Sequence, residues 1–142
     1  MKLNLSRLML FAVGALLFGS AACAQEINVQ AKVPFDFMVG HKVYPAGQYS
    51  VQNVTYDNHL LRLRNTNSQT AVAILYHPTS SSAPATQSQL VFHRVENAYF
   101  LYQVRVAGNT VCREFQMSHV ETEMARNATD KETVIVAANL IH

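Results

Sequence analysis

Hydrophobic and polar residues alternate with a period of two along much of the chain. The stretch from Glu26 to Met38 shows this most clearly. One face of the expected strand is apolar throughout and carries Ile27, Val29, Ala31, Val33, Phe35 and Phe37. Such alternation is typical of a β-strand with one buried face. Pro34 lacks a backbone N–H, so this strand is expected to lie at a sheet edge or to be interrupted there.

The same pattern, broken by turn residues, recurs to the end of the chain. After a short return at residues 43–44, further strands are expected at residues 48–54, 59–65, 70–77, 90–95, 98–106, 110–115 and 133–138. The nearly continuous apolar run at 70–77 predicts a central strand. The Ser/Thr-rich segment from Pro78 to Gln89 contains two prolines and predicts a flexible loop.

One short helix is expected near the C-terminus. Ser118 and Glu121 have the spacing of a capping box, and Val120, Met124 and Ala128 recur every four residues. With about seven or eight short strands before and after it, the chain is predicted to be mainly β. We expect a single antiparallel β-sandwich or small barrel with one helix at about residues 118–128.

The segments 90–95 and 98–106 are expected to form a hairpin around Glu96-Asn97. A two-residue loop places His93 opposite Phe100 and Val91 opposite Tyr102, which predicts that His93 is a half-buried packing residue. The same register sets Arg94 against Tyr99 and allows a cation–π contact.

The N-terminal segment has the layout of a secretory signal peptide. Lys2 and Arg7 precede an apolar run at residues 8–18, which is too short to span a membrane, and small residues fill 19–24. Ala22 and Ala24 predict cleavage after Ala24, so that the mature chain starts at Gln25. Residues 1–24 are thus the expected leader and 25–142 a single β-rich domain. In the alternative interpretation Cys23 is lipidated and the protein is a membrane-anchored lipoprotein.

Charge and hydropathy exclude two classes of partner. The chain has 11 Lys and Arg and 9 Asp and Glu; removal of Lys2 and Arg7 leaves nine of each (11 − 2 = 9). A neutral domain has no surplus of positive charge for phosphates, so no nucleic acid partner is expected. No apolar run after residue 24 approaches membrane-spanning length. The predicted location is periplasmic or extracellular.

Candidate chemistry is sparse. Loss of Cys23 would leave Cys112 alone, with an inert thiol or an intermolecular disulfide as the open interpretations and catalysis as a third. The six histidines show no spacing of a metal-binding motif, and no glycine-rich phosphate loop or pair of catalytic acids occurs. We therefore predict no catalytic residue, metal site or cofactor.

Three passages together resemble a group of small exported bacterial β-domain proteins of uncharacterised function. They are VPFDF (33–37) with PAGQY (45–49), LVFHR (90–94) and YFL (99–101). The resemblance extends over nearly the whole mature length. It implies bacterial export and a recurring β-domain, and it carries no catalytic or ligand-binding residues with it.

These observations leave three functional hypotheses. The first is a non-enzymatic exported domain with a structural or interaction role toward an unknown protein or envelope partner. The second is a carrier of a small apolar ligand, with an interior lined by Phe35, Phe37, Tyr49, Phe100 and Tyr102. The third is a thiol- or metal-dependent enzyme. An internal cavity would favour the carrier, and a filled core with an exposed apolar patch would favour the interaction module.

Overall fold

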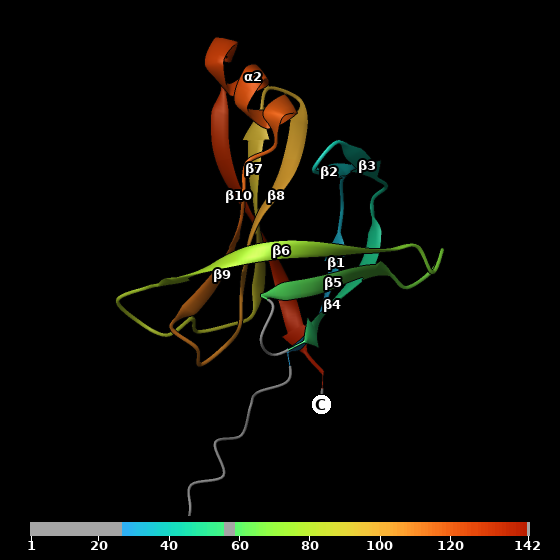
Figure 1. Cartoon of the computed structure of the whole chain (residues 1–142), viewed down its shortest axis with the longest axis vertical. Coiled ribbons are helices and arrows are strands. Elements are labelled where there is room, and N and C mark those ends of the chain that lie inside the picture. Colours follow the sequence, from blue (N-terminus) through green and yellow to red (C-terminus); the bar gives the residue numbers. More distant parts are fainter. Residues whose placement is uncertain (1–26, 56–58, 142) are drawn as a thin grey trace, which may run out of the picture.

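The structure of the protein is a computed structural model that describes residues 27–55 and 59–141. The leader expected from the sequence, with Ala22, Cys23, Ala24 and Gln25, lies outside this range. Figure 1 shows the elements in chain order: β1 (Asn28–Val33), β2 (Phe37–Val39), β3 (Lys42–Tyr44), β4 (Gly47–Thr55), β5 (Leu60–Asn65), β6 (Ala71–Ser80), β7 (Gln89–Val95), β8 (Ala98–Arg105), β9 (Val111–Phe115), α2 (His119–Asn127) and β10 (Lys131–Leu140).

Eight of the strands form a closed barrel in the order β8-β7-β10-β1-β4-β5-β6-β9, and a pairing of β9 with β8 completes the circle. Every pairing within the barrel wall is antiparallel. Hairpin β2–β3 is attached outside this circle, through one parallel pair between Met38 and Phe100. The prediction of a small antiparallel β-fold with one C-terminal helix is confirmed, and of the two architectures expected the barrel is the one formed.

The first period-two stretch is divided where proline predicted an interruption. Strand β1 ends at Val33, and residues 34–36 form a corner before β2 begins. The corner is joined to the next turn, because Asp36 Oδ1 accepts a hydrogen bond of 2.8 Å from the backbone N–H of Ala46. The Tyr49 hydroxyl donates to the carbonyl of Pro45 over 2.6 Å. The VPFDF and PAGQY passages thus hold each other in place.

The barrel interior is filled by side chains from the inward faces of its strands. The Phe37 ring contacts the rings of Tyr49 at 5.0 Å and Phe92 at 5.3 Å between centroids, and Phe35 meets Phe92 at 5.1 Å. Each pair lies close to the edge-to-face geometry that aromatic quadrupoles favour. Buried aliphatic residues of β1, β4 and β5 complete the core, including Val29, Val33, Val51, Leu61 and Leu63.

Strand β6 extends beyond its predicted C-terminal end. It continues through Pro78 to Ser80, where a loop was expected. The N–H of Tyr76 donates to His59 and the carbonyl of Thr70 accepts from Asn65, so even-numbered residues of β6 face β5. Strand β5 begins at Leu60, opposite Leu75, and Pro78 therefore sits beyond its reach. The missing N–H of proline removes no ladder bond at that position.

The expectation that β6 is a buried central strand is also wrong. Its residues alternate between half-buried and exposed, and Leu75 is 66% exposed. The reason is the second neighbour: β9 pairs with Tyr76 to Ser80 only. The N-terminal half of β6 therefore lies between β5 on one side and a cleft on the other.

Substitution of Tyr49 by phenylalanine is expected to cost about 1 kcal/mol at neutral pH, because it leaves the Pro45 carbonyl without its buried donor. The substitution should also change how the free energy of unfolding depends on pH above neutrality. Burial raises the pKa of Tyr49 above 10.0, so the folded form keeps the phenolic proton after the unfolded chain has lost it. Stability must then fall as pH rises from about 10. Urea unfolding between pH 8 and 11 should show a shallower alkaline decline in Tyr49→Phe, and equal slopes would contradict this.

Candidate functional site

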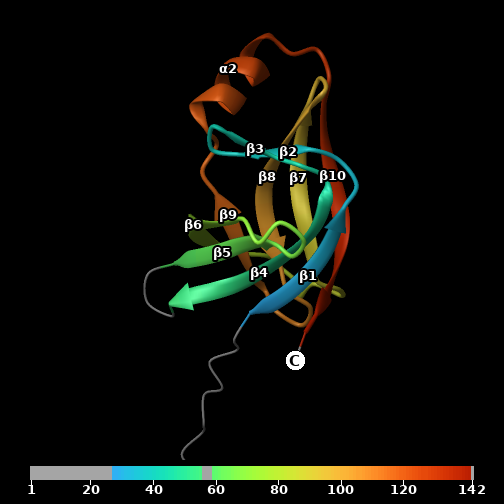
Figure 2. The same ribbon diagram turned by 90° about the vertical axis from the view of Figure 1, so that its right-hand side faces the viewer.

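An apolar cleft opens in the barrel wall between β6 and hairpin β2–β3. Its volume is about 480 Å³. Figures 1 and 2 show the hairpin lying between the level of helix α2 and that of β6. The lining is mainly apolar and includes Met38, Val39, Val72, Ile74, Leu75, Phe100, Leu101 and Phe115. Among the described residues that line it, His77 and Glu121 are the titratable ones, so the cleft suits an uncharged occupant.

Glu121 stands at one end of this cleft as a buried carboxylate. Its side chain is 5% exposed and its Oε1 atom lies 2.8 Å from Nδ1 of His93 on β7. The backbone N–H of Glu121 donates to Ser118 Oγ, which confirms the first half of the capping box. The carboxylate does not return to the backbone of Ser118, as a capping box requires, and is bound to His93 instead. This contact joins helix α2 to the barrel.

A second hollow of about 320 Å³ lies beside the same contact. It is bordered by Met117 and Ala125 near and on the helix and by residues of β7 and β10, with Glu121 and His93 again among them. Glu121 therefore borders both surface hollows, and its partner His93 borders the second. Whatever moves α2 changes the shape of both.

The β7–β8 hairpin follows the predicted register at its tip. His93 pairs with Phe100 and Arg94 with Tyr99, and His93 is half-buried as expected. Further along, Val91 pairs with Gln103 rather than Tyr102, because a bulge inserts one residue into β8. Tyr102 is thereby placed over the imidazole of His93, with ring centroids 3.9 Å apart.

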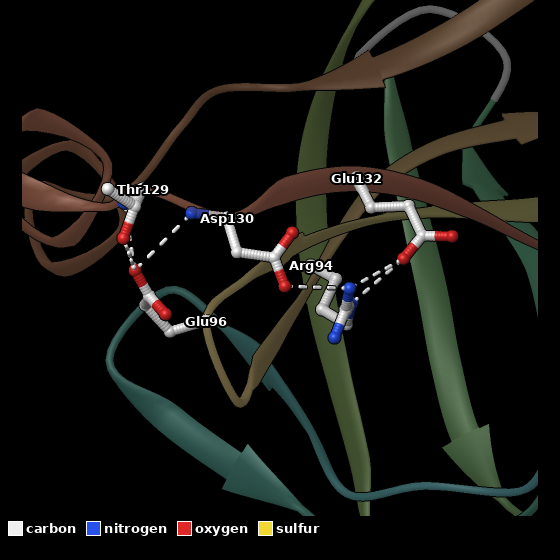
Figure 3. A network of polar contacts seen from close by, with 5 residues as sticks. All are labelled: Arg94, Glu96, Thr129, Asp130 and Glu132. Atoms are coloured by element: carbon white, nitrogen blue, oxygen red, sulfur yellow. Dashed lines mark hydrogen bonds and ion pairs between the residues drawn. The ribbon is translucent and has the colours of Figure 1, made fainter.

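The expected contact between Arg94 and the Tyr99 ring is replaced by ion pairs. Arg94 Nη2 lies 2.9 Å from Asp130 and 2.7 Å from Glu132 at the start of β10 (Figure 3). The ring of Tyr99 stacks on Phe35 instead, at 3.8 Å. Burial acts to lower the pKa of the guanidinium, but the two carboxylates outweigh it and raise that pKa. This cluster of charges is a clasp between β7 and β10.

Glu96 completes the clasp at the hairpin tip. Its backbone adopts a φ of 54°, a conformation usually occupied by glycine. The carboxylate accepts hydrogen bonds from the N–H groups of Thr129 and Asp130 and from the Thr129 hydroxyl (Figure 3). These bonds lower the pKa of Glu96 and offset the strained turn. The absence of glycine from the loop is thus explained by a contact from residues far along the chain.

The five aromatic residues considered for a carrier do not share one interior. Phe35, Phe37 and Tyr49 gather in the barrel, where their rings contact one another or Phe92. Phe100 alternates with the core residue Leu101 and lines the cleft, while Tyr102 lies on His93. The sequence pattern identified the aromatics but not the side of the sheet that each one occupies.

The thiol of Cys112 is 5% exposed on β9. An intermolecular disulfide at Cys112 stays a prediction, and it would require exposure of this buried side chain. Across residues 27–55 and 59–141, no group of three or more His, Cys, Asp or Glu is arranged to hold a metal ion. None of the helices in that part of the chain is long and apolar enough to span a membrane.

Two buried charged residues, Glu121 and Arg113, were not predicted as such from the sequence. Glu121 was recognised only as a helix-capping residue, and its partner His93 lies 28 positions away. Arg113 is buried on β9 without an acidic partner among the described residues; its guanidinium lies 5.8 Å from the Tyr76 ring and donates to the Val111 carbonyl. Burial lowers the pKa of Arg113. Alternation on β9 left its face ambiguous, so no local signal revealed this residue.

No protein-family model matches the chain, and neither a curated protein nor a solved structure is significantly similar to it. The site must therefore be interpreted from its own geometry.

Removal of the His93 imidazole should destabilise the protein by about 2–3 kcal/mol, because it leaves the buried Glu121 carboxylate without a partner. In His93→Ala/Glu121→Gln the unpaired charge is absent, so part of the loss should be recovered. Urea unfolding of the wild type, His93→Ala, Glu121→Gln and the double variant gives the coupling energy between positions 93 and 121. His119→Ala is the matched control, since that imidazole is exposed and 3.9 Å from Glu123. Additive effects at positions 93 and 121 would contradict the contact.

Burial of Cys112 predicts slow reaction with a thiol reagent. In residues 25–142 this is the only cysteine. Its modification by Ellman's reagent in the folded state should be at least about a hundredfold slower than in urea, since the thiol becomes accessible only on opening. A native protein that reacts at the denatured rate, or that runs as a dimer on a non-reducing gel, would contradict this prediction.

Proposed function

We propose that the protein is an exported, non-enzymatic interaction module that binds a partner in the cell envelope through the cleft between β6 and β2. The observation that carries this proposal is the cleft itself: an apolar opening of about 480 Å³ with Leu75 exposed at its rim. Exposed apolar surface of this kind is a usual mark of a protein–protein interaction site. Export rests on the leader pattern of residues 1–24.

The packing of the barrel interior supports an interaction module over a carrier. The rings of Phe37, Tyr49 and Phe92 fill the space that a lipocalin-like ligand would need, at centroid distances of 5.0 and 5.3 Å. The apolar surface that remains available is at the wall of the barrel. A surface cleft is accessible to a macromolecule without any opening of the core.

The location of the cleft also supports this role. It is bounded on one side by hairpin β2–β3, which joins the barrel by a single parallel pair. On the other side stands half of β6, and at the end is the His93–Glu121 contact. A partner there would touch hairpin β2–β3 and the half of β6 that does not pair with β9.

Photo-crosslinking from position 75 tests the proposal in cells that export the protein. A benzophenone amino acid in place of Leu75 should yield one predominant adduct with an envelope macromolecule. The matched control is Ile135, an apolar residue 56% exposed on β10, which pairs with Val91 of β7 and does not line the cleft. Position 135 should give no such adduct.

Two results would reject the proposal. Equal labelling from positions 75 and 135 would show non-specific exposure rather than a site. Absence of any adduct at 75, together with a small apolar molecule retained in native mass spectrometry, would favour the carrier.

A further inference from the structure

We propose that the cleft binds its partner by strand addition: an extended segment of another protein pairs with the free edge of β6 at Ala71–Leu75. This inference rests on the proposed function and specifies how the cleft would recognise its occupant. The occupant is a peptide segment in which apolar residues alternate, without a run of charges.

The free edge follows from the direction of the backbone groups. In a strand, the N–H and C=O of one residue point to the same side, and successive residues point to opposite sides. Even-numbered residues of β6 face β5, as the bonds of Thr70 and Tyr76 show. The odd-numbered residues Ala71, Ala73 and Leu75 therefore face away from β5, toward the cleft.

On the side away from β5, no strand of the described residues pairs with these odd-numbered positions. Strand β9 pairs with β6 from Tyr76 to Ser80, and its own pairing ends at Phe115. Beyond Phe115 the chain leaves the wall and enters helix α2 at residue 119. Across the described parts of the chain, the N–H groups of Ala71, Ala73 and Leu75 donate no hydrogen bond to another residue. An added strand would continue the line that β9 occupies lower in the wall.

The side chains around this edge fit an alternating segment. Val72 and Ile74 are half-buried and pack on the barrel core, and Phe115 and Leu101 line the same cleft. Apolar residues of an added strand would face this row, while the residues between them would face outward. An unpaired edge supplies affinity through main-chain hydrogen bonds and specificity through contacts of alternate side chains.

Natural edge strands are usually protected by charges, prolines or bulges. The edge segment Ala71-Val72-Ala73-Ile74-Leu75 contains none of these residues. The large outward side chain of this segment, that of Leu75, is apolar and 66% exposed. An edge without protection on a protein that must remain soluble is consistent with an edge kept for pairing.

A synthetic probe tests the pairing directly. The probe is a capped peptide of about eight residues in which valine alternates with threonine. Its matched control is the same peptide N-methylated at every second residue, which keeps the side chains and removes backbone donors. Fluorescence titration should show that the unmodified peptide binds and that the methylated peptide binds about tenfold more weakly or not at all.

The protein side of the test uses position 73. Ala73→Pro removes one edge N–H that faces the cleft and no bond to β5, and it should weaken peptide binding about fivefold or more. Ala73→Val introduces a side chain similar in size to that of proline and keeps the N–H. This variant should therefore bind the unmodified peptide as the wild type does. Hydrogen exchange should slow at Ala73 and Leu75 when the unmodified peptide is added.

The outcomes separate this inference from the proposed function. Equal binding of both peptides, unaffected by Ala73→Pro, would overturn strand addition and leave cleft binding intact. Failure of both peptides to bind, with position 75 still crosslinked in cells, would also overturn strand addition alone. Failure of both peptides without any crosslink at position 75 would overturn both proposals. Reversible dimerisation without peptide, abolished by Ala73→Pro, would overturn the foreign partner and identify a second copy.

Discussion

Closure of the barrel depends on a short pairing between β8 and β9. The register joins Gln103 to Glu114 and Val104 to Arg113, and β9 itself has five residues. The carboxylate of Glu114 reinforces this seam, since it accepts hydrogen bonds from Gln103 Nε2 on β8 and from Thr79 Oγ1 on β6. One side chain thus joins three strands. Because β9 is so short, it closes the barrel only beside Tyr76 to Ser80 of β6 and leaves the wall open beside Ala71 to Leu75. The cleft, the free edge of β6 and the position of helix α2 all follow from the length of β9.

Much of the strand order in sequence could be predicted from alternation and turn residues, because those signals are local. Pro34 marked the break after β1, and the two-residue loop at Glu96-Asn97 set His93 opposite Phe100. Errors arose where a distant partner decides the outcome. Pro78 is tolerated in β6 because β5 has already ended, and the bulge near Tyr102 depends on how β8 meets β7. Neither fact is encoded in the neighbouring residues.

The candidate site was harder to predict for the same reason. Its apolar row on β6 was visible as a continuous hydrophobic run, which normally indicates a buried central strand. The run lines a cleft instead, because the missing neighbour is set by the length of β9. The Glu121 carboxylate carried a helix-capping signal, yet its contact with His93 is made across the fold. Arg94 and Glu96 hold the tip of the β7–β8 hairpin in place through contacts with Thr129, Asp130 and Glu132, which are distant in sequence.

The position of β10 has a consequence for how the chain acquires its structure. This last strand lies between β7 and β1, so the first and last strands of the domain are neighbours. The barrel wall cannot become continuous until residues near Leu140 have left the ribosome. Pairings between such distant segments make folding slow, because the entropy of closing a long loop is lost before the contacts form. The order of strands therefore keeps the chain from completing its fold until its last strand has been synthesised.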